Sequence, residues 1–460
     1  MKTKLMSVLL AATMLSALTA CGGSSGNQPS TESTPPASKA PEKTDETLGV
    51  FHKDATLDET VMVDEGGVKI TATGLTYTND SVELGLTIEN NSGKDLSFIS
   101  GSLGYSCNSI NGYMVEEGYL NCDVANGKKA NDTIQFRYDT LMLYGIDEIA
   151  DLEIGFDMTD DDYNHTYSGP RQVKTSIYDS YDYETNHYQE TITSQAAQNT
   201  YEYEMSYFSQ DTLYEQNGVK LRSSGMMTNR DGETALLLEL ENTTDSMVYV
   251  STSDIGINGL KVNSSTWSTH AINAGKRSIV DVQLTSVLDP AWWDVYGISE
   301  VGSVSLSLGQ SNGDGVELAA DTPVEIVIPD ASAAFDPSGQ EVYNSNGVRI
   351  LSKGVYADPS GLSADLNVLL LVENSSGSNV TIDDVYDSLS VNGYMTSYLC
   401  SSQKLGSGES AVLDIELMDD SLEENKIASP SDVQEIEVGF EIKEGTTTMD
   451  EPTITLPFGE

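Results

Sequence analysis

Few side chains in this chain of 460 residues stand at spacings that could do chemistry. Its four cysteines and four histidines form no Cys-x-x-Cys and no His-x-x-x-His pair, so no zinc site is expected. The one Gly-x-Ser-x-Gly match, Gly22 to Gly26, lacks the strand and helix that a nucleophile elbow needs. Paired carboxylates are uninformative about glycosidase chemistry where Asp and Glu number 72 against 23 Lys and Arg. We therefore expect no catalytic site, no cofactor and no enzyme activity.

Two of the cysteines could face each other. Cys107 and Cys122 flank Asn111-Gly112, and Asn-Gly is a strong hairpin signal because both residues tolerate a positive φ. In an extracellular setting these cysteines could form a disulfide, or they could remain thiols. Cys400 occupies the place of Cys122 in a later repeat of the chain, and we expect it to be a lone buried thiol.

Three tryptophans are the candidate ligand-binding aromatics. Trp292 and Trp293 are adjacent, and Trp267 could provide a third platform for stacking a sugar ring. The alternative is that the pair packs over the end of a β-sandwich, because it stands just before the Tyr296-Gly297 turn. The first interpretation predicts a carbohydrate- or solute-binding protein, and the second a structural role.

The charge of the chain restricts its partners. A formal net charge of −49 argues against nucleic acid, because no basic surface could release counterions from phosphate. Such a surface could bind divalent cations weakly. The run Asp160-Asp161-Asp162 resembles a calcium loop, but His165 occupies the sixth position, where an EF-hand needs Gly. We therefore predict no defined metal site.

The N-terminus predicts a membrane anchor. Lys2 and Lys4 precede an apolar run from Leu5 to Leu18, which is short for a membrane span. The following Thr19-Ala20-Cys21 resembles a bacterial lipobox, which implies cleavage before Cys21 and a diacylglyceryl group on its thiol. Two acyl chains hold a protein firmly on a membrane. We expect a lipid-anchored protein on the extracellular face of the cell membrane.

A unit of about 120 residues then occurs three times. Each copy has a Gly-Val start, a strand ending in Glu-Asn, and an Asn-Gly turn. The Gly-Val start lies seven positions before a second Gly in every copy (67 to 74, 218 to 225, 347 to 354). The three Glu-Asn pairs are Glu89-Asn90, Glu241-Asn242 and Glu373-Asn374. Their Asn is expected to cap the turn by which the chain leaves the strand.

Each copy contains about seven or eight short alternating strands separated by turn signals. This pattern predicts three tandem antiparallel β-sandwiches of immunoglobulin-like type, and therefore an all-β fold. The Tyr- and Glu-rich segment after the first copy could form an edge strand, but we expect a partly ordered linker. The expected divisions are a signal peptide (1–20), a lipidated Cys and disordered Ser/Pro/Thr-rich tether (21–56), sandwich 1 (57–180), the linker (181–208), sandwich 2 (209–331) and sandwich 3 (332–460).

The Gly-Val starts and Glu-Asn strand ends, together with the lipobox and tether, carry a family resemblance. The chain resembles Gram-positive surface lipoproteins with tandem immunoglobulin-like (telokin-like) domains of uncharacterised function. The resemblance implies a binding, adhesion or spacer role toward an extracellular protein or glycan, and it implies no established ligand.

Overall fold

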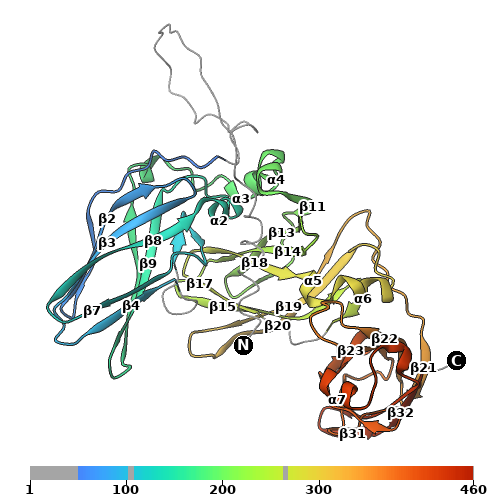
Figure 1. Cartoon of the computed structure of the whole chain (residues 1–460). Coiled ribbons are helices and arrows are strands. Elements are labelled where there is room, and N and C mark those ends of the chain that lie inside the picture. Colours follow the sequence, from blue (N-terminus) through green and yellow to red (C-terminus); the bar gives the residue numbers. More distant parts are fainter. Residues whose placement is uncertain (1–49, 102–107, 263–267, 459–460) are drawn as a thin grey trace. The chain divides into compact units, whose positions relative to one another are not determined.

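The computed structural model describes residues 50–101, 108–262 and 268–458. Nearly all regular structure in these residues is β, in sheets whose strands pair mostly antiparallel, as Figure 1 shows. The expected all-β fold of antiparallel sandwiches is thereby confirmed. The predicted signal peptide (1–20) and most of the predicted tether (21–56) lie outside the described residues.

The first repeat forms two sheets around one core. One sheet has the order β1-β2-β3-β8. Its strands are β1 (Thr60–Glu65), β2 (Val68–Tyr77), β3 (Ser81–Asn90) and β8 (Lys128–Arg137). The strands of the other sheet are β4 (Leu96–Ser100), β5 (Ser109–Ile110), β6 (Tyr113–Met114), β7 (Leu120–Val124), β9 (Asp151–Asp160) and β10 (His165–Lys174). Helix α2 (Tyr138–Leu143) follows β8.

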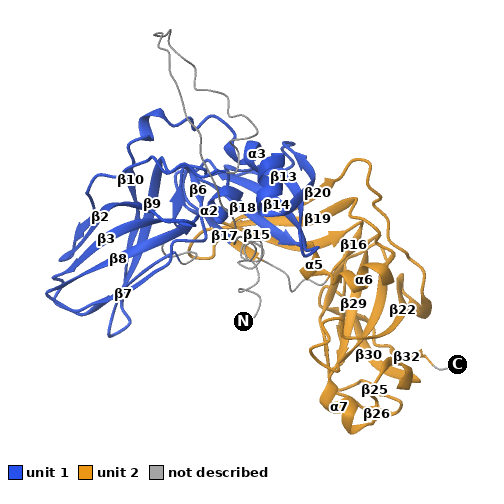
Figure 2. Cartoon of the chain, turned by 45° about the horizontal axis from the view of Figure 1, so that its top comes forward, with its two compact units in different colours: residues 1–248, 270–283 blue, residues 249–269, 284–460 orange. Residues whose placement is uncertain are grey.

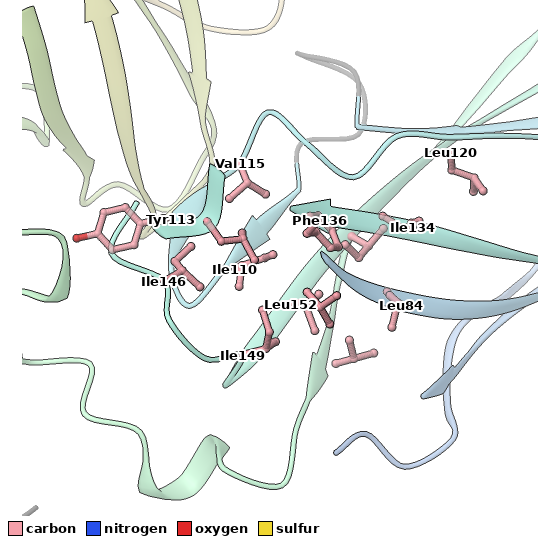
Figure 3. Packing of buried hydrophobic residues seen from close by; sticks show 14 of the residues in the cluster. Leu84, Ile110, Tyr113, Val115, Leu120, Ile134, Phe136, Ile146, Ile149 and Leu152 are labelled. Atoms are coloured by element: carbon pink, nitrogen blue, oxygen red, sulfur yellow. The ribbon is translucent and has the colours of Figure 1, made fainter. Parts of the chain in front are cut away.

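Alternation of apolar and polar residues explains this core. Along β3, every second side chain is fully buried, as expected for a strand with one face toward the interior. Figure 3 shows Leu84 and Phe136 of the first sheet packed with Leu152 of the second. All three side chains are 0% exposed, so the two sheets share one apolar interior.

The strands of the second repeat are divided between two compact units (Figure 2). Unit 1 comprises Met1–Val248 and His270–Gln283, and unit 2 comprises Tyr249–Thr269 and Leu284–Glu460. Unit 1 receives β12 (Glu215–Gln216), β13 (Val219–Asn229), β14 (Thr234–Asn242) and β18 (Arg277–Gln283). The elements that lie in unit 2, apart from the first residue of β15, are β15 (Val248–Ile257), β16 (Leu260–Lys261), α5 (Leu284–Val287), α6 (Pro290–Val295), β19 (Ser303–Ser311) and β20 (Glu317–Val327). Strand β17 (Ser268–Ile272) is divided between the two units after Thr269. The division into three separate domains stays a prediction.

The third repeat has the layout of the first. Its first sheet contains β21 (Gln340–Ser345), β22 (Val348–Ala357), β23 (Leu366–Asn374) and β29 (Ser410–Leu417), with β27 (Tyr398–Cys400) beside β29. Its second sheet contains β24 (Val380–Asp384), β25 (Ser390–Val391), β26 (Tyr394–Met395), β28 (Gln403–Leu405), β30 (Glu435–Glu444), β31 (Thr447–Asp450) and β32 (Thr453–Pro457). Helix α7 (Asp419–Glu424) and the 3₁₀ turn η3 (Pro430–Asp432) connect β29 to β30.

The segment expected to be a partly ordered linker is folded instead. It begins after the 3₁₀ turn η2 (Tyr178–Ser180) and contains α3 (His187–Ile192), α4 (Gln195–Tyr201) and β11 (Tyr203–Ser209), which pairs with β13. Asn186 and Ser194 cap the two helices through their side-chain oxygens. Tyr188 is 1% exposed and belongs to the core of unit 1. Burial of such aromatic side chains supplies the order that the polar composition did not suggest.

Candidate functional site

The most distinctive polar site lies where the first repeat meets β18 of the second, within unit 1. Strand β6 pairs in parallel with β18, with Tyr113 opposite Arg277. The Arg277 amide donates to the Gly112 carbonyl at 2.9 Å. This pair joins the sheets of two repeats into one, of order β11-β13-β14-β18-β6-β5-β9-β4-β7. The Asn111-Gly112 hairpin, predicted from sequence, positions Tyr113 at this join, and both its residues have positive φ (49° and 87°).

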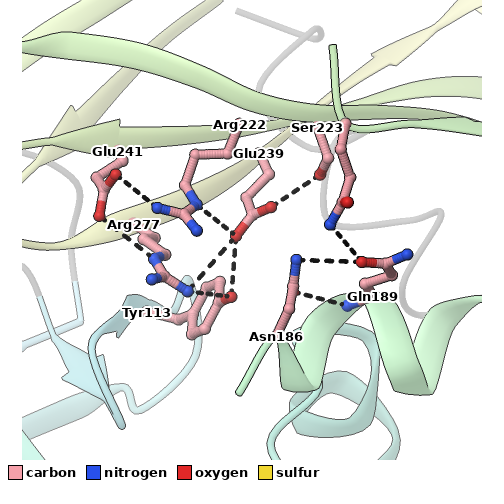
Figure 4. Close-up of polar contacts among 9 residues, drawn as sticks. Tyr113, Asn186, Gln189, Arg222, Ser223, Glu239, Glu241 and Arg277 are labelled. Carbon is pink, nitrogen blue, oxygen red and sulfur yellow. Dashed lines mark hydrogen bonds and ion pairs between the residues drawn. The ribbon is translucent and has the colours of Figure 1, made fainter. Parts of the chain in front are cut away.

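A buried carboxylate occupies the centre of this site (Figure 4). Glu239 of β14 is 0% exposed. It accepts hydrogen bonds from the Ser223 hydroxyl at 2.8 Å and from the Tyr113 hydroxyl at 3.0 Å. Nε of Arg222 and Nη1 of Arg277 each lie 3.8 Å from its Oε1. Two cations and two hydroxyl donors therefore balance the charge that the fold buries.

Further ion pairs continue from this centre toward the surface. Glu241 accepts from Arg222 at 2.8 Å and lies 3.6 Å from Nε of Arg277. Nζ of Lys276 lies 2.6 Å from Glu153 of β9, so a cation of the second repeat meets an anion of the first. Burial, and then the Glu239 charge, raise the pKa of the Tyr113 hydroxyl. Tyr113 therefore stays protonated and serves as a hydrogen-bond donor.

Unit 2 contains a second join of the same design. Strand β16 pairs in parallel with β29, with Leu260 opposite Ser410. The Asn258-Gly259 turn precedes Leu260 as Asn111-Gly112 precedes Tyr113, so the register is the same. Nζ of Lys261 lies 2.8 Å from Glu409, so an ion pair again connects two repeats. Here the earlier repeat supplies the cation, whereas in unit 1 the later repeat supplies it through Lys276. The arrangement is suited to holding strands together.

The candidate aromatic residues are placed differently from one another. Trp292 of α6 is 7% exposed, and its ring centroid lies 5.6 Å from that of Tyr356. Trp293 is half-buried, and its indole N–H donates to the Leu288 carbonyl at 2.9 Å. Trp267 lies outside the described residues. Trp292 therefore packs in the interior and Trp293 is partly exposed, and a stacking role for Trp293 or Trp267 stays a prediction.

The cysteine predictions stay largely open. Cys21 and Cys107 lie outside the described residues, so the lipidation and the disulfide remain predictions. Cys122 is buried on β7, opposite Phe98, and burial raises the pKa of its thiol to about 11. Cys400, which was expected to be buried, is half-buried, and desolvation of its thiol raises the pKa to about 12. Neither thiol is therefore a nucleophile at neutral pH.

The acidic run at Asp160 closes a hairpin. The Asp160 side chain accepts from Lys94, from both nitrogens of Asn164 and from the Asp162 amide. The Lys94 bond most, and then the Asn164 bonds, lower the pKa of Asp160. In the described parts of the chain, no three His, Cys, Asp or Glu side chains group so as to hold a metal ion. Across the same residues, no helix is long and apolar enough to cross a membrane.

Sequence reasoning missed the network around Glu239. One signal was present, because Glu239 interrupts the apolar run Leu236 to Leu240, where Thr87 and Leu371 occupy the corresponding positions. A charge in a buried strand requires a partner. The partners come from β6, β13 and β18, and only the tertiary structure brings those strands together.

Comparison with known proteins gives no family. No family model and no curated protein matches the chain. Among solved structures, similarity extends to a protein of unknown function from Porphyromonas gingivalis W83 (11% identity, 49% of this chain and 91% of that one, TM-score 0.15). It also extends to the Amycolatopsis orientalis exo-chitosanase CsxA (7%, 88% and 79%, 0.18) and to a Bacteroides uniformis beta-glucuronidase (12%, 49% and 26%, 0.16). At these TM-scores the similarities carry no conclusion about fold or activity.

Proposed function

We propose that this chain is a membrane-anchored extracellular lipoprotein whose β-sandwich repeats serve as a binding, adhesion or spacer module. The lipobox-like Leu18-Thr19-Ala20-Cys21 supports the anchor, and the Ser/Pro/Thr-rich segment after it supports a tether. An acidic, soluble surface suits an extracellular protein that must not adhere to anionic polymers.

The observation that carries the spacer role is the join between repeats. Flexible linkers usually let consecutive domains move relative to one another. Here the first repeat and β18 of the second share a sheet, and buried ion pairs surround that connection. Unit 2 repeats the device at β16 and β29. Within each unit such a join should resist separation of the strands that it connects, which supports a structural role in a binding or spacer module.

We also propose that the chain is not an enzyme. A catalytic acid or base must be able to reach a proton on the substrate. Glu239, a fully buried carboxylate, is instead engaged by Ser223, Tyr113 and two arginines. These contacts engage both oxygens of Glu239, which supports a structural role for this carboxylate.

Fractionation of bacterial cells that make the full chain tests the anchor. We expect the native protein in the membrane fraction and accessible to protease added to intact cells, and a Cys21→Ala variant in a soluble fraction. Cys400→Ala, which removes a thiol elsewhere, should leave the protein on the membrane. Membrane retention of the Cys21→Ala variant would overturn the anchor.

A glycan array probed with residues 22–460, which include every described residue, tests the carbohydrate alternative. Binding that disappears in Trp293→Ala, while the far-ultraviolet circular dichroism spectrum is unchanged, would favour a glycan-binding role. Retention of binding in Trp293→Ala would remove this residue as the platform.

A further inference from the structure

An identical four-residue sequence forms a hairpin in the first repeat and again in the third. Asn-Gly-Tyr-Met occupies 111–114 in the first and 392–395 in the third. Ile110 pairs with Tyr113 as Val391 pairs with Tyr394. The Asn side chain accepts from the Ala150 and Asp151 amides in the first hairpin, and from the Gln434 and Glu435 amides in the third. The two hairpins are therefore held by the same contacts.

Their surroundings differ in one respect. Tyr113 and Met114 are 5% and 8% exposed, and β18 pairs beside Tyr113. Tyr394 and Met395 are 57% and 62% exposed, and β26 ends its sheet, whose order is β26-β25-β30-β24-β28. In the first repeat, β18 of the second repeat covers the edge of this hairpin. Among the described residues, no strand covers the corresponding apolar edge of the hairpin in the third repeat.

The strand of the first repeat that corresponds to β18 also has an unpaired edge. Strand β8 ends the sheet β1-β2-β3-β8 of the described first repeat. The ladder places Lys129 opposite Glu89 as it places Arg277 opposite Glu241, so Lys128 and Lys129 correspond to Lys276 and Arg277. Both lysines are exposed. Lys129 binds Glu89 at 2.8 Å, whereas the described residues supply no ion-pair partner for Lys128.

The charges at the two free edges are complementary. Glu153 pairs with Ser109 as Glu437 pairs with Ser390, so Glu437 is the third repeat's counterpart of Glu153. Glu153 is the residue that binds Lys276 at 2.6 Å in the join of unit 1. Glu437 is exposed and Lys128 is its matching cation. The outgoing edge of the third repeat and the incoming edge of the first thus carry the residues that already form a join within one chain.

We propose that β26 of one copy pairs in parallel with β8 of a second copy, in the register of the β6–β18 join. Tyr394 stands opposite Lys129 of the second copy, and Glu437 binds its Lys128. The two edges differ, so the contact is heterologous and each added copy leaves a new free edge. The product is an open series of head-to-tail oligomers.

Lysines at a sheet edge commonly protect it from unwanted pairing. That protection is not decisive here, because β18 carries Lys276 and Arg277 at the corresponding positions and is paired. The contact between copies lacks one hydrogen bond that the unit 1 join has. In unit 1 the Tyr113 hydroxyl donates to Glu239, but Thr87 occupies the corresponding position in the first repeat, so the Tyr394 hydroxyl would find no carboxylate there. The intermolecular contact is therefore smaller and weaker than the internal join.

Sedimentation velocity on residues 22–460 over a concentration series tests the proposal. An interface of so few residues falls below the size of stable complexes, so the series must extend to about 1 mM. We expect the weight-average mass to rise past the dimer without a plateau. A monomer at all concentrations would overturn the proposal and leave the edge to a different partner, and a plateau at the dimer would overturn it too.

Three variants assign any association to these edges. Tyr394→Glu should abolish it, whereas Leu362→Glu, which changes a side chain that is 92% exposed on another turn of the same unit, should not. Lys128→Glu or Glu437→Lys should each weaken association roughly fivefold, and the double variant should restore it because the ion pair reforms with reversed polarity. Association unchanged in Tyr394→Glu, or a double variant weaker than both single ones, would contradict the pairing. These results are independent of the membrane anchor, since the soluble chain is used.

Discussion

At the scale of single residues, the Asn of each Glu-Asn pair holds a turn together. The Asn90 amide donates to the Lys94 and Val124 carbonyls at 2.8 and 2.7 Å, and its oxygen accepts from the Ser92 amide and hydroxyl. Asn242 and Asn374 make the same set of contacts. All three are almost fully buried, so each satisfies backbone groups that water cannot reach.

Replacing the Asn90 side chain should therefore lower the stability of the protein. Asn90→Ala removes the donor to the buried Val124 carbonyl and the acceptor of the Ser92 amide, and we expect a loss of about 2 kcal/mol in the free energy of unfolding. Urea denaturation followed by circular dichroism measures it. The exposed Asn131→Ala should change stability by less than about 0.5 kcal/mol. Equal effects of the two substitutions would show that the buried contacts contribute nothing.

Asp414 gives the third repeat a pH dependence. It lies on β29, and both its oxygens accept from the Asn367 amide at 3.1 Å. Burial raises the pKa of Asp414 to about 6, and the Asn367 bond offsets part of that shift. The folded state therefore binds more protons than the unfolded state between about pH 4 and pH 6, because an unfolded Asp titrates near 4. The stabilisation is complete below pH 4 and is lost as the pH rises through 6.

Asp414→Asn should remove this dependence. We expect the variant to be more stable than the native chain at pH 7 by about 2 kcal/mol, because an amide carries no charge to desolvate. The difference should disappear near pH 4. Denaturation midpoints at pH 4, 5, 6 and 7 measure it, with the exposed Asp420→Asn as the control. A variant that loses stability at every pH would show that Asp414 is needed as a carboxylate.

At the scale of elements, the Gly-Val start is a turn that only Gly can occupy. Gly67 has φ of 80°, and a Cβ there would lie 2.5 Å from the Asn91 carbonyl oxygen. Gly218 and Gly347 have φ of 79° and equally close neighbours. The preceding residue is less restricted, since Gly66 has nothing within 4 Å and Asn217 and Asn346 take its place in the other copies.

Substituting Gly66 and Gly67 in turn distinguishes two costs. At Gly66 only the positive φ is unfavourable, whereas at Gly67 a Cβ would also clash with backbone atoms. Gly66→Ala should cost about 1 kcal/mol, because its positive φ is disfavoured for Ala. Gly67→Ala adds a clash with backbone that cannot rotate away, so we expect more than about 3 kcal/mol. Thermal denaturation of both variants compares the two sites. A cost at Gly67 no larger than at Gly66 would mean that the Asn91 loop shifts freely.

At the scale of the whole molecule, one sheet of unit 1 crosses from one repeat into the next. Its crossing point depends on Glu239, whose partners come from β6, β13 and β18. Removing one member of a buried ion network commonly costs about 3–5 kcal/mol, because the remaining charges stay unpaired. The two repeats should therefore respond together to a change at this point.

Hydrogen exchange can detect that coupling. Glu239→Ala should accelerate amide exchange in β14 and β18 of the second repeat and in β5 and β6 of the first. Glu373→Ala, which removes a partly exposed carboxylate paired with Arg349 at 3.0 Å in unit 2, should leave these strands unchanged. Acceleration confined to the second repeat would show that the first repeat gains no stability from the join.

The repeat, the all-β class and the local turns can all be predicted from the amino-acid sequence. These follow from patterns of short range, such as alternation along β3 and the Asn-Gly turns, which depend on backbone sterics near each residue. The prediction of a partly ordered linker at 181–208 is wrong. The segment is mostly polar, and its order comes from a few buried aromatic side chains such as Tyr188.

The strands that join the repeats cannot be predicted from local sequence patterns. The parallel pairing of Tyr113 with Arg277 brings together residues 164 positions apart, and no local preference encodes such a contact. The same chain segment, Asn-Gly-Tyr-Met, is buried in one repeat and exposed in another because its neighbours differ. Burial is a property of the surrounding strands, and a sequence motif alone therefore could not distinguish an internal join from a free edge.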